Sequence, residues 1–291
     1  MCRFVLYMGE PITLANLITE PANSLINQSF HSRQQEEPLN GDGFGVAWYA
    51  SKLSDKPAVF RSVTPAWNNL NLLNLARVTV SDCVLAHVRA ATPGLPTTEQ
   101  NCHPFIHGPF AFMHNGDLNG FHDVRRDLLS SLGAEAFELV HGNTDSEHVF
   151  ALFIDELGKT AWGKNKIHTG AMMARSLERA ISRALKLCTD HGFGSDATYL
   201  NIAISDGHCA VACRFTGAEE ALSLYVHHGG QYQCEGGVCR MRSADQRDGA
   251  VIISSEPLSD EDGWEEVPPN HIVIVEADFH LMRRKLRLTS G

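Results

Sequence analysis

The 291-residue sequence lacks the long apolar runs that membrane-spanning helices require, and it lacks a secretory signal. A spanning helix needs about 20 consecutive apolar residues, and no stretch approaches that length. The first apolar run ends at Glu10 and Pro11, too soon for the apolar region and cleavage site of a signal peptide. Eight cysteines are too few for a disulfide scaffold. We therefore expect a soluble protein of the reducing cytoplasm.

Positive charge is also scarce, with 24 Lys and Arg against 34 Asp and Glu. The single dense basic run, residues 283–285, is expected to be a solvated strand end. Because phosphate binding needs clustered Lys and Arg, the composition argues against a nucleic-acid partner. With 43% hydrophobic residues, a packed core is expected. No shift in composition marks a linker, so residues 1–291 are expected to form a single domain.

Strand-like segments occupy both ends of the chain, and most helical segments lie between them. Apolar patterns predict strands at residues 2–8, 43–50, 58–63, 83–90, 110–116, 198–205, 209–215, 222–228, 250–255 and 271–277. Helical periodicity predicts helices at 12–18, 68–78, 121–132, 145–157 and 171–187, while 22–42 is expected to be irregular. Thr144, with Glu147 three residues further on, is expected to cap the helix at 145–157. This order lacks regular βαβ alternation. It predicts an α+β fold with largely antiparallel sheets, layered with helices.

Cys2 is the first candidate for chemistry. Removal of Met1 would leave a thiol and an α-amine on the same residue. An α-amine has a pKa of about 7.7–8.0, against about 10.4 for lysine, so it can accept a proton near neutral pH. One residue would then carry both the nucleophile and its base. The alternative is that Cys2 only begins a buried strand.

Three stretches place polar residues where a strand or helix meets a loop. They are residues 87–94, 114–117 and 142–147. Such ends allow polar groups to converge on a site while the scaffold stays apolar. We therefore expect these stretches to line one pocket.

The residue types in these stretches suit a substrate with a carboxylate and an ammonium on one carbon, such as a γ-glutamyl compound. Arg89 offers a guanidinium for the carboxylate, and Asp145 offers a carboxylate for the ammonium. The Asn115 amide and the Gly116 backbone N–H are donors suited to a developing oxyanion. The alternatives are a structural ion pair for Arg89 and a favourable helix-dipole interaction for Asp145.

Short motifs across the chain carry a family resemblance. In order they are Met1-Cys2-Arg3, HVRAAT (87–92), HPF (103–105), HNG (114–116) and TDSE (144–147), followed by SEP (255–257) and residues 267–276. Together they resemble the glutaminase domain of class II glutamine amidotransferases, which are N-terminal nucleophile hydrolases. The resemblance implies a four-layer αββα sandwich, in which two antiparallel sheets are flanked by helices. It implies no cofactor and no metal.

The resemblance also implies a role for each matching residue. Cys2, after loss of Met1, is the nucleophile that forms a γ-glutamyl thioester. The binding roles are Arg89 for the α-carboxylate, Thr92 for a further hydrogen bond, Asp145 for the α-ammonium, and Asn115 with Gly116 for the oxyanion.

Some positions depart from parts of this family. Members that feed ammonia to a sugar-phosphate synthase carry Trp and His where this chain has Ala90 and Pro93. Residues 28–33 and 40–49 are instead similar to the stand-alone branch, which includes γ-glutamyl hydrolases of the ergothioneine pathway and a subunit of a glutathione-degrading complex. The glycine-rich loop 40–45 is expected at the rim of the pocket.

The resemblance implies hydrolysis of a γ-glutamyl amide or peptide bond with release of glutamate. There are two alternatives. One is a glutaminase subunit that delivers ammonia to a separate synthase, and the other is a non-enzymatic protein that binds γ-glutamyl ligands or a partner. A protein partner or a homo-oligomer is compatible with each of them.

Histidines and cysteines outside these roles raise the question of a metal site. His103 and His114 are expected to make structural hydrogen bonds rather than to bind metal or act as a base. Four cysteines lack the tight pair spacing of zinc ribbons and are expected to be buried free thiols: Cys209, Cys213, Cys234 and Cys239.

Overall fold

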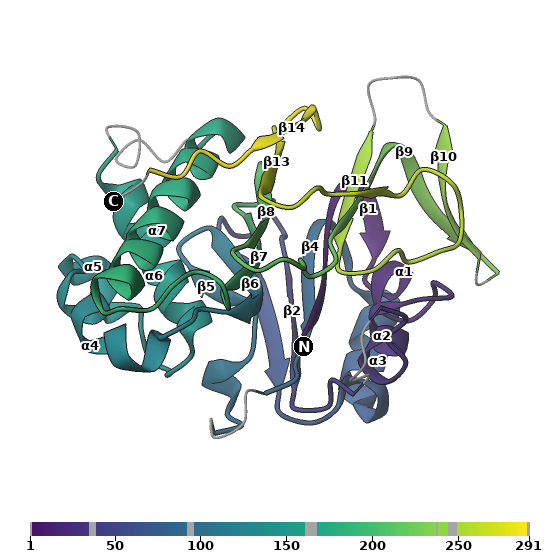
Figure 1. Ribbon diagram of the computed structural model, residues 1–291. Coiled ribbons are helices and arrows are strands. Elements are labelled where there is room, and N and C mark those ends of the chain that lie inside the picture. Colours follow the sequence, from purple (N-terminus) through teal and green to yellow (C-terminus); the bar gives the residue numbers. More distant parts are fainter. Residues whose placement is uncertain are drawn as a thin grey trace.

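The computed structural model describes residues 2–34, 39–91, 96–160, 168–236, 238–243 and 249–289. Two antiparallel sheets lie face to face, with a layer of helices outside each (Figure 1). The eight-stranded sheet contains β1 (Arg3–Thr13), β2 (Phe44–Trp48), β3 (Ala58–Ser62), β4 (Val80–Val88), β9 (Tyr225–Glu235), β10 (Val238–Ser243), β11 (Ala250–Ser254) and β12 (Glu265–Glu266). Its order is β10-β9-β11-β1-β4-β2-β3, and β12 pairs with β9.

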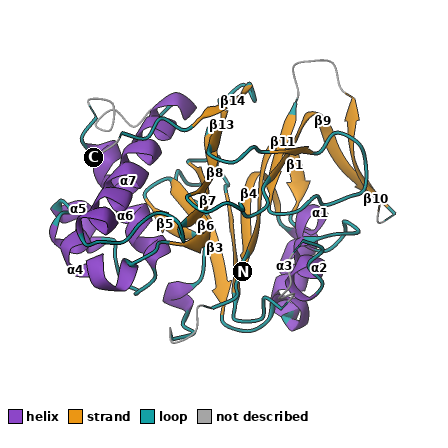
Figure 2. Ribbon diagram, viewed as in Figure 1, coloured by secondary structure: helices purple, strands orange, loops and turns teal. Residues whose placement is uncertain are grey.

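The six-stranded sheet has the order β14-β13-β8-β7-β6-β5. Its strands are β5 (Phe105–His107), β6 (Phe110–Asp117), β7 (Tyr199–Ser205), β8 (Ala210–Thr216), β13 (His271–Val275) and β14 (Leu281–Lys285). Outside it lie α4 (Phe121–Ser130), α5 (Ala134–Glu138), α6 (Asp145–Gly158) and α7 (Gly170–Asp190). Outside the other sheet lie α1 (Ala15–Ile18), α2 (Leu25–Phe30) and α3 (Leu70–Val78), as Figure 2 shows by colour. Among the described helices, none has both the length and the apolar character needed to cross a membrane.

The alternation of side chains along β1 explains why this strand lies at the centre. Phe4, Leu6 and Met8 pack in the core between the two sheets. Val5 and Tyr7 point the other way, into the core beneath α1–α3. A strand places successive side chains on opposite faces, so an unbroken apolar run is buried on both. β1 therefore holds the start of the chain firmly between two layers.

The N-terminus of α6 is fixed by its cap. The Thr144 hydroxyl accepts a hydrogen bond from the Glu147 backbone N–H at 3.3 Å. The Glu147 carboxylate in turn accepts the N–H groups of His141 at 3.0 Å and Gly142 at 2.6 Å. The first bond satisfies a helix-end donor that has no partner inside the helix, and the other two tie the preceding loop to the first turn of the helix. The cap expected from the sequence is confirmed, and it sets the position of Asp145, the first helical residue.

The predicted α+β sandwich with largely antiparallel sheets is confirmed. The prediction that residues 22–42 are irregular is wrong, because α2 lies within them. Ser24 starts this helix by accepting a hydrogen bond from the Asn27 backbone N–H at 3.3 Å. The strand predicted at 222–228 begins only at Tyr225 and continues to Glu235. The residues beyond 228 are polar and glycine-rich and carry no strand-like apolar pattern, so the hairpin of β9 with β10 was not predicted.

The prediction of free thiols holds for Cys209 and Cys213, which are buried and unpaired. It is wrong for Cys234 and Cys239, which form a disulfide. The two residues are directly opposite each other in the β9–β10 register, a pairing that sequence spacing did not reveal. The other six cysteines of the chain are free.

Candidate active site

Cys2 and Arg89 lie side by side at one end of the larger sheet. Arg3 of β1 pairs with Val88 of β4, so the residues just outside this pair are neighbours. The half-buried Cys2 thiol lies 3.5 Å from the Ala90 carbonyl oxygen. Burial raises the pKa of this thiol, although the Ala90 hydrogen bond and the nearby Arg89 charge oppose the shift. The thiol therefore holds its proton near neutral pH and needs a base to become a nucleophile.

A buried ion pair holds the Cys2 backbone in place. The Arg3 guanidinium, 1% exposed, lies 2.9 Å from the Glu256 carboxylate. Arg3 also donates to the Cys2 carbonyl at 2.7 Å and to the Ser32 hydroxyl at 2.7 Å. Burial alone would raise the pKa of Glu256, but hydrogen bonds from Ser32, the Arg33 backbone and Arg3 lower it. The carboxylate therefore stays charged and anchors the start of the chain.

Replacement of Glu256 by glutamine is expected to destabilise the fold by about 3–5 kcal/mol, because it removes a carboxylate charge that pairs with a buried guanidinium. Urea unfolding measures this loss. The matched control is Asp190→Asn, which removes the partner of Lys186 in an exposed pair. That change is expected to cost less than about 1 kcal/mol. Equal losses in the two variants would contradict an anchoring role for Glu256.

Arg89 carries a buried positive charge that no acidic side chain of the described residues neutralises by an ion pair. The residue is 4% exposed. Its Nη1 atom has no hydrogen-bond partner within the described part of the chain. A buried charge without a partner is costly, so this guanidinium is suited to an anionic ligand. The structural ion pair considered for Arg89 from the sequence is absent from the described residues.

The glycine-rich loop 40–45 lies against the Arg89 backbone. Asp42 donates its backbone N–H to the Arg89 carbonyl at 3.0 Å, and Arg89 donates to the Gly43 carbonyl at 2.8 Å. Gly43 has a φ of +120°. A Cβ atom there would lie 2.8 Å from the Cys102 sulfur, so only glycine fits. The loop lies next to the candidate site, as the sequence predicted.

A histidine contact joins the two sheets beside Arg89. The Nε2 atom of His87, on β4, lies 3.2 Å from the carbonyl oxygen of His114, on β6. Burial lowers the pKa of His87 to about 3, so the ring is neutral and donates this hydrogen bond. Arg89 is two residues beyond His87, and Asn115 is next to His114. The contact therefore brings the ends of β4 and β6 together.

Asn115 and Gly116 follow His114 on β6. The Asn115 side chain is 1% exposed, and its Oδ1 atom has no hydrogen-bond partner among the described residues. A Cβ atom on Gly116 would lie 1.8 Å from the Tyr199 carbonyl oxygen, so this position admits only glycine. The Asn115 side-chain amide and the Gly116 backbone N–H are donors of the kind that can stabilise an oxyanion.

Asp145 approaches β6 from the N-terminus of α6. Its carboxylate accepts the Leu118 backbone N–H at 2.9 Å and the Ser146 backbone N–H at 2.7 Å. Ser146 also hydrogen-bonds His114 Nδ1 at 2.9 Å. The helix end is thus tied to the strand that carries Asn115.

Asp117 is a further acidic residue beside Asp145. Partial burial of its carboxyl group and the charge of Asp145 raise the pKa of Asp117. Two carboxylates near each other attract a cation, such as a substrate ammonium. Asp117 lies in the 114–117 stretch, but its role could not be predicted from the sequence. Its position directly after His-Asn-Gly was the available signal.

The predictions for the two histidines have different outcomes. His114 makes structural hydrogen bonds, with Ser146 Oγ at 2.9 Å and the Tyr199 carbonyl at 3.1 Å, as expected. The prediction for His103 is wrong, because neither ring nitrogen has a hydrogen-bond partner among the described residues. Its ring instead packs 4.2 Å from that of His87 and 4.6 Å from that of Phe105. Burial lowers the pKa of His103 well below its usual value, so the ring stays neutral.

A neutral histidine also supports the α6 N-terminus and makes stability depend on pH. Arg125 donates to His148 Nε2 at 3.3 Å, while His148 Nδ1 donates to the Thr144 carbonyl at 2.7 Å. Burial lowers the pKa of His148 to about 4. The unfolded chain, with a histidine pKa of about 6.5, therefore binds more protons. The free energy of unfolding is expected to fall as the pH drops from about 6.5 to about 4.

Urea unfolding at about pH 7.5 and about pH 5 measures this loss. His148→Gln keeps a donor and an acceptor but cannot titrate, so the difference between the two pH values is expected to shrink. His271→Gln, at a half-exposed ring, is the control and is expected to leave the difference unchanged. An unchanged difference in His148→Gln would contradict the prediction.

The structure therefore brings Cys2, Arg89, Asn115, Gly116 and Asp145 to one region around the His87–His114 contact. Met1, Thr92 and residues 161–167 lie outside the described residues.

Residues 13–285 match the family model for class-II glutamine amidotransferases, so this chain belongs to that family. The probable glutamine amidotransferase DUG3 of Saccharomyces cerevisiae is 40% identical, with 97% of this chain and 84% of that protein covered. The γ-glutamyl-hercynylcysteine sulfoxide hydrolase of Mycolicibacterium smegmatis is 27% identical over 97% of this chain and 98% of its own. A glutamine aminotransferase class-II domain protein from Silicibacter pomeroyi has a similar solved structure, with a TM-score of 0.68, 26% identity, and coverage of 99% and 100%. The resemblance stated from the sequence is confirmed.

Proposed function

We propose that this protein hydrolyses a γ-glutamyl amide or peptide bond through a thioester at Cys2 and releases glutamate. The observation that carries the proposal is the buried Arg89 guanidinium, which lies beside the Cys2 thiol with an unpaired Nη1. A carboxylate that binds there brings the rest of the substrate to the thiol. The relative from Mycolicibacterium smegmatis is named as a hydrolase of a γ-glutamyl compound, which supports the same chemistry here.

In the proposed complex, Arg89 binds the α-carboxylate and Asp145, with Asp117 nearby, binds the α-ammonium. The scissile carbonyl oxygen then points at the Asn115 amide and the Gly116 N–H. Thr92 is proposed to add a hydrogen bond to the substrate. These contacts fix the γ-carbonyl carbon in front of the Cys2 sulfur, which lowers the entropic cost of attack.

The proposed reaction has two stages. The α-amine of Cys2, freed by removal of Met1, takes the thiol proton, and the sulfur attacks the γ-carbonyl carbon. The tetrahedral intermediate then collapses with cleavage of the carbon–nitrogen bond, and the α-amine of Cys2 gives its proton to the leaving nitrogen. Water then attacks the thioester as the amine accepts its proton; the carbon–sulfur bond breaks, the amine returns the proton to the Cys2 sulfur, and glutamate leaves. The raised pKa of the Cys2 thiol is the reason that a nearby base is required.

Replacement of Asp145 by asparagine is expected to lower kcat/KM for glutamine by about 10- to 100-fold, because a charge-assisted hydrogen bond worth about 1.5–3 kcal/mol is lost. Asparagine keeps an acceptor for the Leu118 N–H but loses the second oxygen, which accepts the Ser146 N–H, so the unfolding midpoint is measured alongside kcat/KM. The sharper measurement uses the glutamine analogue that lacks the α-amine. Wild-type enzyme should prefer glutamine, and the variant should lose that preference. A variant that loses activity equally on both compounds would indicate only the helix-dipole role.

A glutaminase subunit that delivers ammonia to a separate partner is the second candidate. It is favoured by the 40% identity to a protein named as a probable glutamine amidotransferase. A substrate panel distinguishes the two: glutamine, glutathione and other γ-glutamyl conjugates are compared for glutamate release. The proposed hydrolase should turn over one γ-glutamyl conjugate well as an isolated chain. Weak activity on every compound, with a stable partner in native extracts, would support ammonia delivery instead.

We further propose that residues 1–291 act as one domain in the cytoplasm. The single-domain proposal is supported by the larger sheet, in which β1 lies between β4 and β11 from distant parts of the chain. Six of the eight cysteines are free, which supports a reducing compartment, and we expect the Cys234–Cys239 disulfide to be reduced there.

A further inference from the structure

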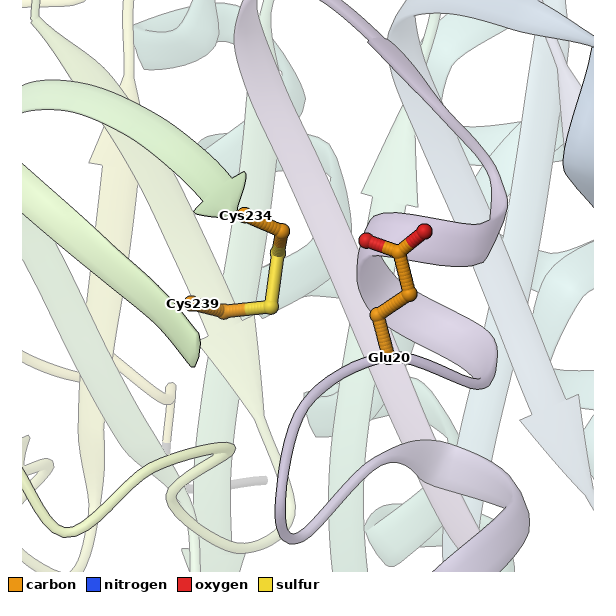
Figure 3. Close-up of side chains that lie close together, drawn as sticks. All are labelled: Glu20, Cys234 and Cys239. Carbon is orange, nitrogen blue, oxygen red and sulfur yellow. A yellow bond between two sulfur atoms is a disulfide. The ribbon is translucent and has the colours of Figure 1, made fainter. Parts of the chain in front are cut away.

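A second group of reactive side chains lies far from Cys2, beyond the other end of β1. Cys234 and Cys239 face each other on the β9–β10 hairpin, and Glu20 lies beside them (Figure 3). Cys234 Sγ lies 3.6 Å from the carbonyl oxygen of Asn16, three residues beyond β1. Because β1 has 11 residues and a strand rises about 3.3 Å per residue, the cysteine pair lies about 30 Å from Cys2. The γ-glutamyl chemistry does not use this group.

We propose that the reduced Cys234–Cys239 pair and Glu20 form a binding site for a soft divalent cation, such as zinc. The two sulfur atoms and a Glu20 carboxylate oxygen all lie within 4.8 Å of one another. Two thiolates bound to one tetrahedral zinc ion, at about 2.3 Å each, lie about 3.8 Å apart. The Cα atoms are 3.9 Å apart in the oxidised pair, and the hairpin register alone holds directly opposite residues about 4.5–5.5 Å apart, so both sulfurs stay within that reach after reduction.

The surroundings of Glu20 support a ligand role. Asn16 donates its side-chain N–H to one Glu20 oxygen at 2.7 Å, which orients the carboxylate. Such hydrogen bonds to a ligand are a regular part of metal sites. With two thiolates and one carboxylate, a fourth position would remain for water. The ligand set is that of a cation with affinity for sulfur rather than of magnesium or calcium.

The pair can be reached from two sides. Cys239 lines a pocket of about 610 Å³, and Cys234 lines another of about 540 Å³. The first pocket is also lined by Asp260, Glu261 and Asp262. Asp260 pairs with Arg33 at 2.6 Å and Glu261 lies 3.1 Å from His227, so their charges are partly balanced. A small thiol and a metal ion can therefore both reach the sulfur atoms.

The disulfide is the oxidised form of the same pair. A thiol reductant supplies two electrons and two protons, the sulfur–sulfur bond breaks, and the reductant becomes a disulfide. The cation then binds both sulfurs and displaces the two thiol protons. Disulfide and metal site therefore exclude each other. The proposal is independent of the γ-glutamyl chemistry, since it uses no residue of that site.

Titration of the reduced protein with cadmium tests the site through the ultraviolet charge-transfer band of a thiolate–cadmium bond. Intact mass first verifies that the pair has gained two hydrogens. One equivalent of cadmium is expected to bind, and zinc is expected to displace it. The Cys234→Ser/Cys239→Ser double variant should lose the band. Glu20→Gln should weaken cadmium binding by about tenfold, a loss typical of residues that complete or support a metal site.

The matched control is Cys188→Ser, a free buried thiol in another core, which should bind like the wild type. The oxidised protein should bind no cadmium at this site. A reduced wild type that gives no band, or a double variant that binds as tightly as the wild type, overturns the proposal. Glu20→Gln keeps both thiols, so it tests the site even if the double variant does not fold.

Discussion

Replacement of Cys2 by alanine is expected to reduce glutamate release by at least about 1,000-fold, because it removes the atom that forms the covalent intermediate. The thiol lies beside Arg89, and the Arg3–Glu256 pair holds its backbone. Since alanine keeps that backbone, the fold should be intact, with an unchanged unfolding midpoint. Cys2→Ser should also be strongly impaired, because a hydroxyl is a weaker nucleophile than a thiol.

The control for this prediction is Cys102→Ala. The Cys102 thiol is also buried near Arg89, and burial raises its pKa. Its sulfur lies 3.5 Å from the Thr98 carbonyl oxygen and 3.6 Å from that of Ser62, and a hydrogen bond to either one indicates a structural role. Its loss should change turnover by less than about tenfold, since it leaves the reacting atom in place. If Cys102→Ala were inactive and Cys2→Ala active, the assignment of the nucleophile would be wrong.

Replacement of Arg89 by alanine is the change with the second-largest expected effect. A buried guanidinium that binds a carboxylate with two hydrogen bonds contributes about 3–4 kcal/mol, so kcat/KM should fall by about 100- to 1,000-fold. Because the α-carboxylate does not change during the reaction, most of the loss should be in KM. Lysine should rescue only part of it, since it lacks the planar fork.

Two comparisons separate binding from a structural role. A substrate analogue without the α-carboxylate should be turned over equally slowly by wild type and Arg89→Ala. Arg61→Ala is the matched control, because this guanidinium also lies near Cys102 but next to Glu147. It should reduce kcat/KM by less than about tenfold, the effect of a residue outside the substrate contacts. An unchanged KM in Arg89→Ala would contradict the binding role.

Much of the fold could be predicted because it follows from local patterns. The continuous apolar run of residues 2–8 indicated a strand buried on both faces, and β1 has that position. The Thr144–Glu147 spacing indicated a helix start, and the cap is present. The helix α2 was missed because it is six residues long and its start depends on one Ser24 contact. Such a short segment carries little periodicity.

The site was predictable as a set of residues but not as an arrangement. Arg89, Asn115 and Asp145 were chosen for their chemistry and for the family resemblance. That they meet depends on the His87–His114 contact between two sheets, which no local pattern shows. The pairing of Cys234 with Cys239 likewise depends on hairpin register. Long-range packing decides both.

The most direct test of the central claim is covalent labelling of the enzyme with a glutamine analogue whose amide is replaced by a diazomethyl ketone. Such a compound binds as a γ-glutamyl group and alkylates the nucleophile. The account predicts one adduct per chain, on the N-terminal peptide that begins with Cys2 and lacks Met1, and excess glutamate should block it. An adduct on Cys102, or none while the enzyme still releases glutamate, would contradict it.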